Sequence, residues 1–290
     1  MRIKTVKDSR SLTLIFPLPA TQKYYRSRPL NMLGFLVGHE GKGSLLSLLK
    51  EEGLASGLSA GGGDSTSSYT SFNINIQLTP KGLKRYTKVI ERTFQYLRLL
   101  REKSLPRYVY EEVRRMAEID YRFAEKTGGT RLVNMFSLLM QIYPLRSVES
   151  TPFLISEYRP RLFDSMLFRL IPENMLALLA AKNLETDQTE KYYGTEYAYL
   201  ENRADLIKKW KKVKSHPKLS MPEANPFLPE SLEVLPFSGT LSLSYQSLAG
   251  LKREGLDAEL MQKLEEQAGQ SFVDLDESRK KVGFQGTTVE

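Results

Sequence analysis

The sequence predicts an α+β fold in which a mostly antiparallel sheet is covered on one face by long helices. Two observations carry this prediction. Residues 72–78 alternate strictly between apolar and polar side chains, as in a strand with one buried face. Residues 80–103 instead repeat apolar side chains at helical spacing. The order of strands and helices along the chain leaves room for antiparallel pairing.

The first elements follow from local signals. Residues 11–16 are apolar and β-prone, and we expect Pro17 to stop this strand. A helix is predicted over residues 29–37, ending in a cluster of glycines. Ser44 is a good N-cap for a second helix over residues 45–52.

Two strands and a helix are predicted for the next segment. A short strand is predicted over residues 54–60, followed by a loop or hairpin turn at the glycines 61–63. The alternating strand spans residues 69–78. Thr79 and Pro80 are then a typical helix start, and we expect one continuous helix to residue 103.

The later elements are predicted from periodicity and from proline and glycine breaks. They are helices over 106–126, 131–142 and 162–170, a buried strand over 175–180, and a polar strand or loop over 192–199. We divide the chain into an α+β domain, a Pro-rich strap and a divergent acidic tail, over residues 1–214, 215–238 and 239–290. The tail is expected to be partly helical, over residues 256–267, or disordered.

Composition excludes several classes of site. The chain has 290 residues, no cysteine and only two histidines, so neither a disulfide framework nor a cysteine zinc cluster can form. The formal charge is +8, divided as +11 over residues 1–238 and −3 over residues 239–290. A solvated basic surface accounts for this charge, and we do not expect a nucleic-acid partner. No apolar stretch approaches a membrane span, so no membrane partner is predicted, and the compartment stays open.

The segment from Gly34 to Ser44 contains two incomplete motifs. Lys42 precedes Gly43, whereas a phosphate loop needs the lysine after the glycine. His39 and Glu40 resemble the start of a zinc helix, but glycine stands where the second histidine belongs. We therefore expect no metal ligand and no catalytic residue here, and interpret His39 as a helix-terminal residue next to the last carbonyls.

The ordered motifs of this chain closely resemble the insulinase (pitrilysin) family of zinc metallopeptidases, in the second, non-catalytic domain of its long-chain members. The resemblance covers roughly residues 5–237. It rests on FPLP (16–19), LGFLVGHEGKGSLLSLLK (33–50), YPL (143–145), RLIPEN (169–174), YGTEY (193–197) and PEANPFLP (222–229).

The resemblance implies an insulinase-type α+β domain without the H-x-x-E-H zinc site, which would lie in a partner catalytic domain of the same or another chain. It also implies an exosite, where a strand edge accepts the N-terminal end of a peptide substrate as an added strand. The matching positions are Phe35, Gly38, His39, Glu40, Leu58, Ser59, Ala60 and Gly61. Family members often carry histidine where this chain has Phe35, which puts any contact by that side chain in question.

Three classes of function stay open from the sequence. The first is the zinc-free, substrate-anchoring domain of a metalloendopeptidase, with no peptidase activity of its own. The second is a free-standing pseudo-subunit that pairs with a separate catalytic chain. The third is a basic nucleic-acid binder, which predicts binding that weakens steeply with salt.

Overall fold

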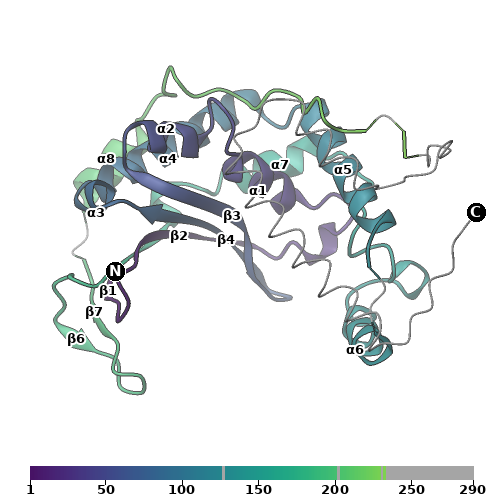
Figure 1. Ribbon diagram of the computed structural model, residues 1–290, viewed down its shortest axis with the longest axis horizontal. Helices are drawn as coiled ribbons and strands as arrows, with labels where there is room; N and C mark the ends of the chain where they lie inside the picture. The colour runs from purple at the N-terminus through teal and green to yellow at the C-terminus, as the bar shows by residue number, and fades with distance from the viewer. Residues whose placement is uncertain (126–127, 201–202, 230, 233–290) are drawn as a thin grey trace, which may run out of the picture. The chain divides into compact units, whose positions relative to one another are not determined.

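A twisted sheet forms the centre of the computed structural model, which describes residues 1–125, 128–200, 203–229 and 231–232 (Figure 1). All of these except 231 and 232 belong to one unit, Met1–Pro229. Within this part the strand order is β3-β4-β2-β5-β1-β7-β6. The strands are β1 Arg2–Lys4, β2 Arg10–Pro19, β3 Ala55–Ser65, β4 Tyr69–Leu78, β5 Leu176–Ala181, β6 Gln188–Thr189 and β7 Glu196–Ala198.

The pairing is antiparallel throughout this sheet except between β1 and β5, which run parallel. In Figure 1, α1, α2, α4, α7 and α8 lie on the same side of the sheet. The predicted α+β fold is therefore confirmed. The helices are α1 Pro29–Gly38, α2 Leu45–Glu51, α3 Pro80–Lys84, α4 Tyr86–Lys103, α5 Arg107–Arg122, α6 Gly129–Leu139, α7 Pro160–Leu167 and α8 Ala204–Lys211.

The core lies between the sheet and these helices. The inward residues of β2 and β4 face each other in register, for example Leu14 opposite Ile74, and both are fully buried. Phe94 of α4 meets Phe16 of β2 edge to face, with ring centroids 6.3 Å apart. The opposite face of the sheet carries half-buried polar side chains such as Thr13 and Asn75. One apolar and one polar face are what the alternating sequence predicts.

The glycines 61–63 are strand rather than turn, which corrects the prediction. The turn lies further along, where the Thr66 amide donates to the Tyr69 carbonyl at 2.8 Å. At Gly63 a Cβ atom would lie 2.3 Å from Asn73 Nδ2 and 2.4 Å from Ser71 Oγ, so a larger residue there would displace these β4 side chains. The glycines therefore extend the strand instead of ending it.

Pro17 does not stop β2, which continues to Pro19. Pairing of β2 with β5 ends at Ile15 opposite Leu176. On that side of the strand no β5 residue lies opposite Pro17, so the missing amide of Pro17 costs no hydrogen bond to β5. Its carbonyl accepts a hydrogen bond from Asn174 Nδ2 at 2.9 Å. Proline is tolerated where a strand lacks a neighbour on that side.

The helix expected over residues 80–103 is divided at Arg85, whose φ of −116° and ψ of 30° leave the helical region. The short α3 is fixed to the start of β3, because the Thr79 hydroxyl donates to the Gly53 carbonyl and Gly82 packs against the Leu54 carbonyl. The longer α4 packs on the core instead. The helix expected over residues 256–267 and the strap beyond residue 232 lie outside the described residues.

Candidate functional site

Strand β3 is an edge strand of the described sheet, since it pairs with β4 alone. The central residue of its exposed edge is Ala60. A Cβ atom added to Gly34 of α1 would lie 3.0 Å from the Ala60 carbonyl oxygen, and one added to Gly38 would lie 3.7 Å from the Ala60 nitrogen. The backbone of Ala60 thus lies directly beside α1. Gly34 and Gly38 are one helical turn apart on the same face of α1. Neither residue has a side chain that could cover the backbone of Ala60.

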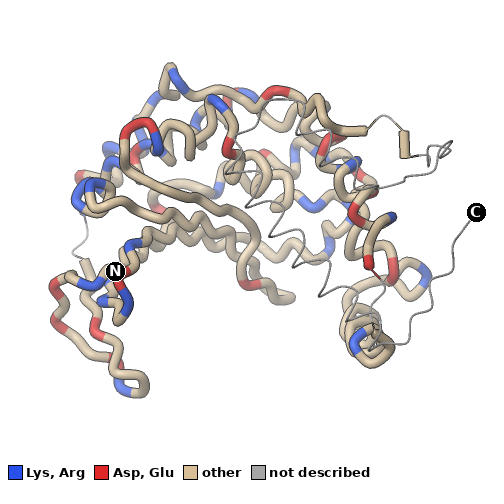
Figure 2. Tube along the Cα trace, in the orientation of Figure 1, with Lys and Arg blue, Asp and Glu red and all other residues tan. Residues whose placement is uncertain are grey.

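The β3 edge is almost free of charge. Figure 2 shows that Lys and Arg are spread over helices and loops with Asp and Glu between them, whereas the central strands are largely uncharged. Asp64 is the one charged residue of β3, and β4 has none. Exposed edge strands usually carry charges or prolines that prevent another strand from pairing. This edge lacks both beside Ala60.

A pocket of about 370 Å³, here called the edge pocket, lies between β3, α1 and α5. Its walls are mostly backbone and apolar side chains. The lining residues are Leu30, Asn31, Gly34, Phe35, Ala60, Gly61, Gly62 and Val113. None of them is charged, so the pocket suits an apolar group.

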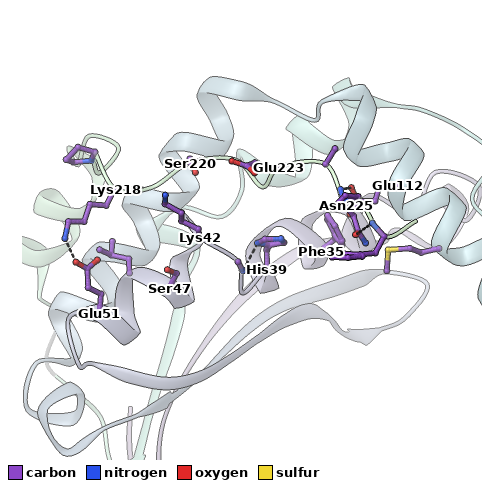
Figure 3. Close-up of a pocket in the computed structure, with 18 residues that line it drawn as sticks. Phe35, His39, Lys42, Ser47, Glu51, Glu112, Lys218, Ser220, Glu223 and Asn225 are labelled. Atoms are coloured by element: carbon purple, nitrogen blue, oxygen red, sulfur yellow. Dashed lines mark hydrogen bonds and ion pairs between the residues drawn. The ribbon is translucent and has the colours of Figure 1, made fainter. Parts of the chain in front are cut away.

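A larger cavity of about 820 Å³, here called the strap cavity, lies on the other side of Phe35 (Figure 3). Its walls are the glycine turn after α1, the helices α2 and α5, and residues 217–227 of the strap. The Ser220 amide donates to the Gly43 carbonyl at 3.0 Å, and φ at Gly43 is +79°. A positive φ at this position favours glycine, which holds the strap against the turn.

Helix α5 holds the rest of the strap. The Tyr108 hydroxyl donates to the Pro222 carbonyl at 2.6 Å, and the Asn225 amide donates to Glu112 Oε2 at 3.1 Å. Burial, and after it the Glu112 carboxylate, raises the pKa of the Tyr108 hydroxyl, which therefore stays protonated as a donor. These bonds fix one wall of the strap cavity.

His39 lies at the C-terminal end of α1 and lines the strap cavity. Its Nδ1 accepts a hydrogen bond from the Gly41 amide at 3.1 Å, and its ring meets Phe35 edge to face at 6.1 Å. The helix-terminal position is as predicted, but the recorded partner is an amide rather than a carbonyl. With Nδ1 as acceptor, a neutral ring carries its proton on Nε2, which is left to bind another group.

Comparison with known proteins identifies the family. Residues 1–116 match the family model described as the peptidase M16 inactive domain, and residues 121–247 match the middle or third domain of peptidase M16. Human insulin-degrading enzyme is 36% identical over 237 residues, which are 81% of this chain and 23% of that protein. The chain belongs to the insulinase (M16) family. It carries non-catalytic domains of that family.

Two further comparisons concern the sequence and the fold. Human nardilysin is 31% identical over 234 residues, or 78% of this chain and 20% of nardilysin. The crystal structure of pitrilysin matches the fold with a TM-score of 0.74 and 23% identity, covering 79% of this chain and 25% of pitrilysin. This M16 chain thus spans about a quarter or less of the length of these relatives.

The described residues of this M16 chain offer no metal site, because no group of three His, Cys, Asp or Glu side chains converges among them. His216 lies on the strap, where its Nδ1 accepts from the Lys218 amide at 3.3 Å. Burial, followed by the charge of Arg92, lowers the pKa of His216 and favours the neutral ring. No described helix is long and apolar enough to cross a membrane.

The predicted site residues fall into three groups. Some line the cavities: Phe35 lines both, His39 the strap cavity, Ala60 and Gly61 the edge pocket. Gly38 faces the Ala60 nitrogen without lining either. The remaining three point elsewhere: Leu58 is buried in the core, Ser59 is exposed opposite Asn75, and Glu40 is exposed with Lys50 at 3.5 Å.

Five of the eight residues that line the edge pocket were not among the predicted site residues: Leu30, Asn31, Gly34, Gly62 and Val113. Leu30 was expected in α1 only as a core residue, yet it also forms a wall of the pocket. Val113 belongs to α5, about fifty residues beyond the β3 residues of the pocket. The helical spacing of Leu30, Gly34 and Phe35 on one face of α1 was the available signal for the first.

Proposed function

We propose that this M16 chain is the substrate-anchoring, zinc-free part of a metalloendopeptidase, and that it forms a wall of the peptide chamber. The N-terminal segment of a peptide substrate adds to β3 as a further strand, at residues 58–61. The observation that carries the proposal is the edge of β3 at Ala60, which pairs with β4 alone, has no charged residue beside it and lies next to Gly34 and Gly38 of α1. Main-chain hydrogen bonds hold such a strand without demanding one sequence.

The family assignment supports a peptide as the ligand. In M16 proteins the inactive domain accompanies a catalytic domain. Insulin-degrading enzyme is named after a peptide hormone, and this chain shares 36% of its residues over the matched region. We assign the zinc ion and the H-x-x-E-H motif to the catalytic partner domain. Within this chain we assign residues 1–214 to the anchoring domain, 215–238 to the strap and 239–290 to the acidic tail.

The roles of the individual site residues follow from their positions. In the proposal, Ala60 supplies the amide and carbonyl that bind the peptide backbone. Leu58 and Ser59 precede Ala60 in the docking edge, and Gly61 follows it. Gly38 leaves space beside the edge. His39 and Phe35 form the wall between docked peptide and strap cavity. To the exposed Glu40, which pairs with Lys50 at 3.5 Å, we assign the attraction of a substrate amine.

The proposal predicts that the 290-residue chain captures a long, unstructured peptide but does not cleave it. A peptide of about thirty residues, labelled at its C-terminus, should show saturable binding in fluorescence anisotropy, because strand addition needs only backbone groups. With added zinc, mass spectrometry should find the peptide intact, since the chain offers no ligand set for the metal among its described residues.

Each arm of this experiment tests a separate statement. Robust cleavage that a chelator abolishes would contradict the assignment as a non-catalytic chain. Absence of saturable binding would contradict the anchoring function. Random DNA at low salt serves as the comparison ligand: binding that is stronger than peptide binding and falls steeply with salt would favour the nucleic-acid alternative.

A further inference from the structure

We propose that the edge pocket is a specificity subsite, which takes one bulky aliphatic or aromatic side chain of the docked peptide. This inference rests on the proposed function, because the pocket is occupied only if a peptide pairs with β3. It adds a substrate class to that function: peptides with a large apolar residue at one position of the docked segment.

The position of the edge pocket makes it a side-chain site. Its wall on the sheet side is the backbone of residues 60–62, the same residues that offer the free strand edge. Side chains of an added strand alternate between the two faces of a sheet. Every second side chain of the docked peptide therefore points to the helix-covered side, where α1 and α5 enclose the pocket.

The lining decides which side chains bind. Leu30, Phe35 and Val113 supply the side-chain walls, and the exposed Asn31 lies at the rim. With no charged residue in contact, a charged side chain would lose its hydration without gaining a partner. The volume of about 370 Å³ leaves room for the largest apolar side chains.

The neighbouring cavities limit the subsite to one strong position. Phe35 separates the edge pocket from the strap cavity, which is lined by charged residues including Lys42, Glu51 and Glu223. On the opposite side, Leu30 and Asn31 also line a pocket of about 380 Å³ that contains Tyr24, Tyr25 and Arg28. Polar or charged groups thus lie on both sides of the edge pocket, so the apolar preference is confined to it.

A guest-residue scan with the wild-type 290-residue chain tests the subsite. The probe is a labelled ten-residue peptide of Gly, Ser and Thr, in which Leu, Phe, Gly, Asp or Lys is placed in turn at each of the first six positions. Because full burial of a large apolar side chain favours binding, we expect one position where Leu or Phe binds about 10- to 100-fold more tightly than Gly or Asp.

Two variants then connect that position to the pocket. Val113→Trp fills the space and should reduce the ratio of Phe to Gly affinity at the selected position to about 1. Val113→Lys places a cation in the wall and should shift the preference toward Asp. Circular dichroism confirms that each variant is folded, and the wild-type scan stands whether or not they fold.

The outcomes separate the subsite from the docking edge. If the peptides bind and Ala60→Pro weakens them, but all guests bind within about twofold of each other, the subsite is overturned and the docking edge stands. If the peptides do not bind, or bind Ala60→Pro as tightly as the wild type, the docking function is overturned and the subsite with it. A single apolar-selective position that Val113→Lys converts to acidic preference supports both.

Discussion

Ala60→Pro is expected to weaken binding of an extended peptide by about tenfold or more. The substitution removes the Ala60 amide, which the proposal directs to the peptide, and a lost hydrogen bond costs roughly 0.5–1.5 kcal/mol before any misalignment of the neighbouring bonds is counted. Pairing of β3 with β4 should survive, because proline is accepted on edge strands. Circular dichroism checks that the variant is folded.

The control for this variant is Gly128→Pro. Gly128 precedes α6 with φ of −58° and ψ of 146°, which proline adopts, and a Cβ atom there meets no other atom within 4 Å. Peptide affinity and melting temperature should match the wild type in this control. An Ala60→Pro protein that is folded and binds peptide with unchanged affinity would rule out the edge at Ala60 as the docking site.

Gly43→Val is expected to detach the strap and to lower the free energy of unfolding by about 1–3 kcal/mol, because a β-branched residue is strained at positive φ. The φ of +79° is one cause, and contact with Ser220 is the second, since a Cβ atom at position 43 would lie 2.0 Å from Ser220 Oγ. The strap cavity would lose the wall that Ser220 supplies.

Hydrogen exchange gives a local readout for this variant. The Ser220 amide donates to the Gly43 carbonyl, so its exchange should be at least tenfold faster in Gly43→Val than in wild type. Gly128→Val is the matched control, with negative φ and open space at Cβ. Unchanged protection at Ser220 together with unchanged stability would show that the turn at Gly43 does not hold the strap.

The sequence predicts well those elements whose signals are local. The alternation from Phe72 to Leu78 predicts the strand, its buried face and its antiparallel pairing, and the structure confirms all three. The Ser44 cap also forms as expected, with Ser44 Oγ accepting from the Ser47 amide at 3.1 Å. In each case a few consecutive residues contain the whole signal.

Elements that depend on distant neighbours were missed or misjudged. The glycines 61–63 look like a turn until β4 is placed beside them: Gly61 and Gly62 pair with β4, and Gly63 leaves room for the Asn73 side chain. Pro17 stays in its strand because β5, some 160 residues later in the chain, stops pairing before it. No prediction covered α8, which the sequence presents only as a short segment with four charged residues among eight.

The candidate site shows the same division. The glycine turn and the β3 segment were identified from the motif resemblance, and their side-by-side position follows from the fold. Val113 could not be assigned, because the periodicity of α5 gives its apolar face but not the element against which that face packs. The edge pocket exists only where α1, β3 and α5 meet.

A backbone N-methylation scan of a bound peptide tests the central statement, that a peptide docks on β3 as an added strand. Each of the first eight amides of a labelled peptide is methylated in turn and its affinity for the 290-residue chain is measured. Strand addition predicts that methylation lowers the affinity at every second position of the peptide segment that lies opposite residues 58–61 of β3. The reason is that only alternate amides of the peptide point to β3. Equal affinity for all the methylated peptides, or loss without alternation, would contradict docking at this edge.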